Sequence, residues 1–198
     1  MKRKDGFYNI LFSVLGQILT LVLGFIVPKL FIENLGSESN GLMQTINQVF
    51  AYFTLIEAGI GTATVQALYK PLATDDKNEI NSILAATNNY YRKVSIVYSF
   101  CLMAFAILFS LLINSSLDRT MIFWVVIFTG LNSVINFAVQ GKYKLLLNAS
   151  GKSYVVTITT TIITVLNYGS KIALLLLGFD LLSIQIGYFI ISLLQILI

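Results

Sequence analysis

The segment Leu55-Ile56-Glu57-Ala58-Gly59-Ile60-Gly61 places a carboxylate and two glycines inside an apolar run from about Leu42 to Tyr69. A run of this length can cross a bilayer, for which about 20 apolar residues suffice. Glu57 lies near its midpoint, so its carboxylate is expected to face a bundle interior or a water-filled cavity. Gly59 and Gly61 remove side chains beside it and allow close helix packing or a local bend. These two glycines are predicted hinges.

The composition indicates an all-α membrane protein. Of the 198 residues, 57% are hydrophobic and 11% are charged, and the mean hydropathy is +0.82. This length holds about six helical spans with their connections and leaves no room for a soluble domain as well. The chain has no His and a single Cys101, which excludes histidine-based catalysis, histidine metal sites and an internal disulfide. We therefore expect no cofactor and no metal.

The apolar runs predict one domain, 1–198, containing six membrane-spanning helices. Pro28 removes a backbone donor near the end of the first helix and is predicted to act as a hinge there. Polar loops are expected at 33–41 and 141–153. An amphipathic helix at the cytoplasmic membrane surface is expected over 76–93, with Asp76 as its N-cap. The predicted spans cover about residues 8–32, 42–69, 94–113, 120–140, 154–178 and 181–198.

Polar residues recur at helical spacing within most of these spans. The fifth span has the most regular stripe, with its Thr, Asn, Tyr and Lys side chains inside a sector of roughly 120°. Such stripes either pack helices against one another or line a hydrated cavity, and both interpretations stay open. The candidates for a substrate cavity are Asn47, Thr54, Glu57, Asn132, Asn136, Thr164, Asn167 and Lys171.

The two charged candidates each have two interpretations. Glu57 is either a group that carries a coupling proton or a structural carboxylate bonded to neighbouring amides. Lys171 lies near one end of the fifth span. It either attracts an anionic substrate or extends its amine to the headgroup region as an interfacial anchor.

The distribution of basic residues predicts a cytoplasmic N-terminus. Ten of the 13 Lys and Arg residues fall on the side of the predicted bundle that carries the N-terminus. This is the bias that orients membrane proteins, and it explains the net charge of +4 without nucleic acid. The ten residues are Lys2, Arg3, Lys4, Lys70, Lys77, Arg92, Lys93, Lys142, Lys144 and Lys152.

Four segments resemble the polysaccharide-biosynthesis flippases of the superfamily that includes the multidrug and toxin extrusion antiporters. They are LGSESNGL at 35–42, LIEAGIG at 55–61, LYKPLA at 68–73 and YYRK at 90–93. The resemblance implies a six-helix N-terminal lobe of a two-lobed transporter, so the C-terminal lobe is expected to be missing from this sequence. Lipid II flippases are also similar, but they use lumenal arginines, and the first two spans contain none.

The resemblance implies translocation of an undecaprenyl-pyrophosphate-linked oligosaccharide across the bacterial inner membrane by alternating access. O-antigen, capsule or exopolysaccharide synthesis is the implied process. Membrane lipids, a coupling proton or sodium ion and a polysaccharide polymerase are the implied partners. The alternatives are a cation-coupled drug antiporter of the same fold, a membrane-embedded polymerase or glycosyltransferase, and an inactive gene remnant. We expect no enzyme, because no long loop carries clustered Arg, His or acidic residues.

Overall fold

The computed structural model describes residues 3–55 and 58–194, and this part of the chain is helical without a strand. Four of its helices are long and apolar enough to cross a membrane: Gly6–Thr54, Lys77–Leu112, Arg119–Val139 and Ser153–Leu176. The all-α membrane class is therefore confirmed. In chain order the elements are α1 (Arg3–Thr54), α2 (Ala58–Thr74), α3 (Lys77–Leu112), α4 (Arg119–Ile135), the π-helix η1 (Asn136–Gln140), α5 (Gly141–Ala149), α6 (Ser153–Leu176) and α7 (Leu181–Leu194).

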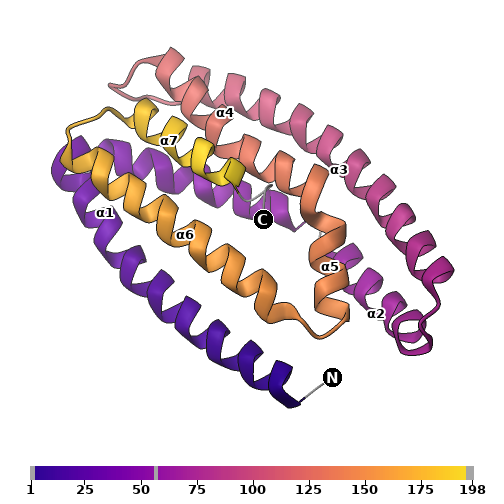
Figure 1. The fold of residues 1–198 in the computed structure, drawn as a ribbon. Helices are drawn as coiled ribbons and strands as arrows, with labels where there is room; N and C mark the ends of the chain where they lie inside the picture. Colours follow the sequence, from indigo (N-terminus) through magenta and orange to yellow (C-terminus); the bar gives the residue numbers. More distant parts are fainter. Residues whose placement is uncertain (1–2, 56–57, 195–198) are drawn as a thin grey trace.

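Helix α1 folds back on itself at Gly36 (Figure 1). A straight helix of its 52 residues would measure about 78 Å, whereas the hydrocarbon core is roughly 30 Å thick. Gly36 adopts φ 82° and ψ 164°, which glycine tolerates because it has no Cβ. The expected loop at 33–41 is therefore wrong: a single glycine separates a first arm (residues 3–35) from a second arm (37–54). Pro28 lies inside the helical first arm.

Helix α3 is continuous, so the prediction of a separate surface helix at 76–93 is wrong. The buried positions Tyr91, Val94, Tyr98, Leu102 and Ala106 follow one another at spacings of three and four, which carries a single packed face through the predicted boundary. No glycine or proline interrupts it. The predicted cap is confirmed, because the Asp76 carboxylate accepts hydrogen bonds from the backbone N–H groups of Asn78 and Glu79.

The expected basic loop at 141–153 is largely helical as well. Helix α4 passes through η1 directly into α5, and only residues 150–152 separate α5 from α6. Gly141 has no side chain, so the Tyr91 ring can pack against the helix at this point. A Cβ there would lie 3.0 Å from Tyr91 Cδ2 and Cε2. Leu145, one turn later, is buried and anchors α5 in the core.

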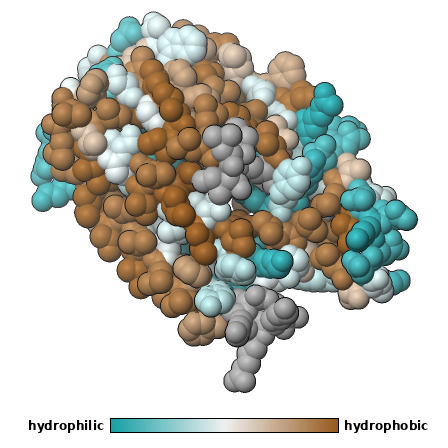
Figure 2. Space-filling model, viewed as in Figure 1, coloured by the Kyte–Doolittle hydropathy of each residue, from teal (hydrophilic) through white to brown (hydrophobic). Residues whose placement is uncertain are grey.

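Hydrogen bonds join the connections at each end of the bundle. At one end the Glu38 carboxylate accepts from Ser115 Oγ (2.7 Å), Ser116 N (2.7 Å) and Ser116 Oγ. At the other end Asn9 Nδ2 donates to Gly151 O (3.1 Å), and Tyr154 N donates to Asn9 Oδ1 (2.6 Å). We name these the Glu38 end and the Asn9 end. In Figure 2 the surface is brown across the middle and teal mainly towards the edges, as expected for a protein with a lipid-facing belt.

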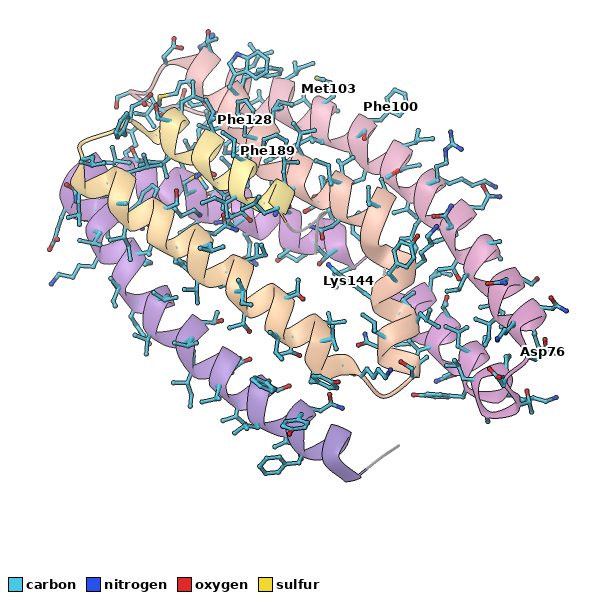
Figure 3. The ribbon with its side chains drawn as sticks, in the orientation of Figure 1. Asp76, Phe100, Met103, Phe128, Lys144 and Phe189 are labelled. Atoms are coloured by element: carbon cyan, nitrogen blue, oxygen red, sulfur yellow. The ribbon has the colours of Figure 1, made fainter. Side chains whose placement is uncertain are left out.

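The core lies where the second arm, α3 and α4 meet. Tyr98 packs against Phe50 and Phe53 with ring centroids 6.3 and 5.5 Å apart. Gly130 of α4 is buried against Leu102 and Phe50, and its missing side chain allows this close approach. On the opposite face of α3, Phe100 and Met103 point outward, with 74% and 49% of their surfaces exposed (Figure 3).

Substitution of Gly130 by Ala is expected to destabilise the bundle by about 1–3 kcal/mol, because overpacking a tight core forces its neighbours apart. The added Cβ would lie 2.8 Å from Phe50 Cζ and closer still to Leu102 Cδ1. The measurement is the midpoint of thermal unfolding of the purified protein in detergent. Gly169→Ala is the control, because no atom lies within 4 Å of a Cβ at that helical position. Equal midpoints for the two variants would contradict this packing.

Single cysteines in a Cys101→Ala background are expected to distinguish the two ends. Ser37 and Asn114 lie at the Glu38 end and Ser150 lies at the Asn9 end, and all three are exposed. In sealed vesicles of one orientation, an impermeant thiol reagent should label Ser37→Cys and Asn114→Cys together and leave Ser150→Cys unlabelled, or the reverse. Permeabilised vesicles provide the control, since all three should then react. Labelling of Ser37→Cys and Ser150→Cys from the same side would show that the ends do not lie across the membrane.

Candidate functional site

A row of small and polar side chains lines the contact between the first arm and α6, which run parallel (Figure 1). Gly16 lies tightly against α6, where a Cβ would lie 2.6 Å from Thr161 Oγ1. A groove of about 260 Å³ follows this contact. We name its lining the polar seam; it consists of Ser13, Gly16, Gln17 and Thr20 of α1 and Thr157, Thr160, Thr161 and Thr164 of α6.

A second pocket lies about one helical turn beyond the polar seam, where Gly24 follows Thr20 and Tyr168 follows Thr164. This pocket of about 190 Å³ could hold roughly six water molecules at about 30 Å³ each. Asn40, Gln44 and Asn47 line it from one face of the second arm, and Lys171 lines it from α6. From Thr157 of the seam to Lys171 of the pocket, α6 advances about 21 Å, roughly two thirds of the approximately 30 Å thickness of a hydrocarbon core. Seam and pocket together therefore offer polar groups over most of a bilayer's depth.

Lys171 is held by an aromatic ring from α7. Its Nζ lies 4.4 Å from the centroid of the Tyr188 ring, within the range of a cation–π interaction. Among the described residues, the only ion pair joins Lys29 and Glu33, so no described carboxylate neutralises the Lys171 charge. An ammonium beside a low-dielectric region attracts an anion more strongly than the same group does in water.

A chain of hydrogen bonds reaches Tyr188 from the other side. The Tyr188 hydroxyl accepts from Asn132 Nδ2 (3.1 Å), and Asn132 Oδ1 accepts from Asn136 Nδ2 (3.2 Å). Asn136 Oδ1 in turn accepts from Lys144 Nζ (3.0 Å). Helices α4, η1, α5 and α7 each contribute to this chain, and Lys144 points into the bundle from α5 (Figure 3).

The structure brings most of the predicted cavity residues together, in two groups. Asn47, Thr164 and Lys171 line the pocket and the polar seam, and Asn132 and Asn136 form the hydrogen-bond chain. Two others lie elsewhere. Thr54 is exposed at the end of α1 and bonds to the carbonyl of Ala51, whereas buried Asn167 donates to Ser192 Oγ (3.4 Å). Glu57 lies outside the described residues, so its role stays a prediction.

The predicted hinges occupy different environments. Pro28 lines the pocket beside Lys171. Gly59 is exposed, with no atom within 4 Å of a Cβ placed there. Gly61 packs close to α5, because its Cβ would lie 3.6 Å from Leu145 Cδ2. Both glycines lie in the first turn of α2.

Sequence reasoning missed Tyr188, Lys144, Asn40 and Gln44 as site residues. The sequence predicts Lys144 in a cytoplasmic loop and Asn40 in the loop at 33–41, whereas the structure places both residues in helices. A usable signal existed for Asn40, Gln44 and Asn47, which recur at spacings of four and three and so share a helical face. Nothing in the sequence pairs Tyr188 with Lys171.

No protein-family model, curated protein or solved structure matches this chain. In the described part of the chain, no three Cys, Asp or Glu residues come together as metal ligands. The polar groups of the seam, the pocket and the hydrogen-bond chain in the described residues include amides, hydroxyls and two ammonium groups.

A cysteine at Asn47 is expected to react with a small charged thiol reagent, because the side chain opens into a polar pocket that water can fill. Val97→Cys is the matched control: Val97 is 54% exposed on α3, outside the seam and the pocket, and should face lipid. Both would be made in the Cys101→Ala background and measured in membranes, where Asn47→Cys should react at least tenfold faster. Equal rates would show that the pocket is no wetter than the lipid-facing surface.

Proposed function

We propose that this chain is part of a flippase that moves a lipid-linked oligosaccharide across the membrane. One observation carries the proposal: the polar seam and the pocket beyond it together offer polar groups over most of a bilayer's depth, and Lys171 lies in that pocket. Sugar hydroxyls and pyrophosphate need such a path, because polar groups in hydrocarbon lose their hydrogen bonds to water. The polyprenyl tail needs no path, since it is soluble in lipid.

The chemistry of the polar seam suits a glycan. Threonine hydroxyls and asparagine and glutamine amides both donate and accept hydrogen bonds, as sugar hydroxyls do. Several seam hydroxyls are occupied by their own helix: Thr20 Oγ1 donates to Gly16 O (2.8 Å) and Thr160 Oγ1 to Val156 O (2.9 Å). Their oxygens still have lone pairs that can accept from a passing ligand.

Lys171 supplies the charge that the anionic head of the substrate needs. A pyrophosphate carries its negative charge on several oxygens, and an ammonium binds it as a point charge. The lysine lies beside the pocket formed by Asn40, Gln44 and Asn47, so a bound anion would also meet amide donors. This arrangement favours an anion-binding role over an interfacial anchor.

The wider arrangement that we propose is the N-terminal lobe of a transporter that resembles the multidrug and toxin extrusion fold. The six crossings of this lobe would be the first arm, the second arm together with α2, α3, α4 with its continuation, α6 and α7. The Asn9 end would then face the cytoplasm of a bacterium. An opposing wall from a second lobe would cover the polar seam, because polar groups that face lipid are costly. In this proposal the transporter works by alternating access coupled to a proton or a sodium ion. A polysaccharide polymerase then receives the translocated oligosaccharide.

Substitution of Lys171 by Gln is expected to weaken binding of a prenyl pyrophosphate about tenfold or more, because a hydrogen bond to a charged group contributes about 1.5–3 kcal/mol. Lys171→Glu should be worse, since it adds repulsion, and Lys171→Arg should retain most of the affinity. Binding of farnesyl pyrophosphate to the purified chain in nanodiscs is the measurement.

Lys152→Gln controls for the loss of one positive charge, because Lys152 is exposed at the Asn9 end, away from the pocket. Protein yield and unfolding midpoint should be unchanged in all four variants. Normal affinity in Lys171→Gln would show that the lysine is only an anchor and that the anion binds elsewhere.

A further inference from the structure

The hydrogen-bond chain from Lys144 to Tyr188 has a direction that chemistry alone determines. An ammonium can only donate, so the Asn136 atom that faces Lys144 Nζ at 3.0 Å must be the amide oxygen. Asn136 Nδ2 then faces Asn132 and donates to its Oδ1 (3.2 Å) and to its backbone carbonyl (3.0 Å). Asn132 Nδ2 is left to donate to the Tyr188 hydroxyl (3.1 Å).

The direction of these hydrogen bonds determines the role of the Tyr188 hydroxyl group. Because its oxygen accepts from Asn132, the O–H group keeps its hydrogen for another acceptor. Within the part of the chain that the structure describes, no group accepts this hydrogen, and Tyr188 is only half-buried. The residue therefore presents a hydrogen-bond donor of known polarity.

The π-helix is what allows Lys144 to set this direction. Asn136 and Lys144 are eight residues apart, a spacing that in a regular α-helix turns the second side chain about 80° away from the first. The extra residue of a π-bulge makes the separation behave as about seven residues, close to two full turns. Helical side chains also lean towards the N-terminus, so Lys144 reaches back to Asn136. Such bulges occur frequently at functional sites.

We propose that Tyr188 is a ligand-binding residue whose hydroxyl donates to an oxygen of the anionic group attracted by Lys171, and that Lys144 is the positioning residue that keeps it a donor. The inference rests on the proposed function, since it assigns new residues to the same anion site. The ligand class is a phosphate or pyrophosphate ester, which offers only acceptors.

Lys171 and the Tyr188 hydroxyl are close enough to share one oxyanion. The ammonium lies 4.4 Å above the ring centroid, so the hydroxyl oxygen at the ring's edge is roughly 5 Å from it. One phosphate oxygen can reach both donors, because each hydrogen bond measures about 2.8 Å. The ring holds the ammonium and the hydroxyl adds a directional contact, so a single side chain supplies both.

A substitution at position 144 can reverse the donor–acceptor direction of the hydrogen-bond chain. A carboxylate at position 144 only accepts, so Lys144→Glu favours a reversed Asn136 amide, with loss of the hydrogen bond from Asn136 Nδ2 to Asn132 O, and Asn132 would follow. Asn132 Oδ1 would then face Tyr188 and take its hydroxyl hydrogen, leaving only a lone pair for the ligand. Lys142→Glu is the matched control, because Lys142 lies over the Tyr143 ring (4.9 Å) and contributes nothing to the chain.

The experiment measures affinity for farnesyl pyrophosphate and for farnesol, with the whole chain in nanodiscs. Tyr188→Phe keeps the ring beneath Lys171 and should weaken farnesyl pyrophosphate binding about fivefold without affecting farnesol, as expected for one lost hydrogen bond. Lys144→Glu should weaken pyrophosphate binding more than Lys142→Glu does. In a Tyr188→Phe background the two glutamate variants should have equal effects, because only their charge then remains.

A second readout needs no ligand. With 3-fluorotyrosine at position 188, the fluorine resonance should move in Lys144→Glu and in Asn132→Ala and stay in place in Lys142→Glu. Equal shifts for the two glutamate variants would overturn the positioning role of Lys144. Normal affinity in Tyr188→Phe would overturn the ligand contact, while Lys171→Gln still tests the proposed function. A wild-type chain that binds farnesyl pyrophosphate no better than farnesol would overturn the anion site itself and the Tyr188 contact with it.

Discussion

Every polar group that enters hydrocarbon must find a partner in the protein or meet water, and this constraint shapes the whole bundle. Helices satisfy the backbone within each segment. Hydroxyl side chains can also be satisfied by their own helix. Ser99 Oγ donates to Ser95 O and Thr129 Oγ1 to Val125 O, each four residues back. These contacts let serine and threonine lie at bilayer depth without a partner helix. Asparagine, glutamine and lysine have more donors and acceptors than their own helix can satisfy, so they gather where helices meet.

Two kinds of polar contact result from this requirement. Between α4, α5 and α7, Lys144 and the two asparagines satisfy one another in a hydrogen-bond chain that ends at the Tyr188 hydroxyl. Between the first arm and α6 the small residues and hydroxyls leave a groove with unused acceptors. Lys171 lies where the two regions approach each other, since it lines the pocket and contacts the Tyr188 ring. A hydrogen-bonded network therefore lies beside a groove lined by hydroxyl groups.

The same constraint explains why interruptions of the helices matter here. Gly36 reverses the chain in one residue, and η1 changes the phase of α4 relative to α5 without breaking the helix. Both features place side chains that a regular helix would have directed elsewhere. Asn40, Gln44 and Asn47 face the pocket from the second arm, and Lys144 donates to Asn136 Oδ1 although the sequence predicts it in a polar loop.

The sequence by itself determined the membrane class, the approximate positions of the apolar helices, the Asp76 cap and the polar stripe of α6, because hydropathy, helical periodicity and capping are local properties. It could not determine that residues 77–112 form one helix or that residues 141–149 continue α4, because burial of Tyr91 and Leu145 against neighbouring helices stabilises those segments. Nor could it pair Lys171 with Tyr188, or Lys144 with Asn136. Those contacts depend on how α7 packs against α6 and on one extra residue in a helical turn, and only the tertiary structure decides either.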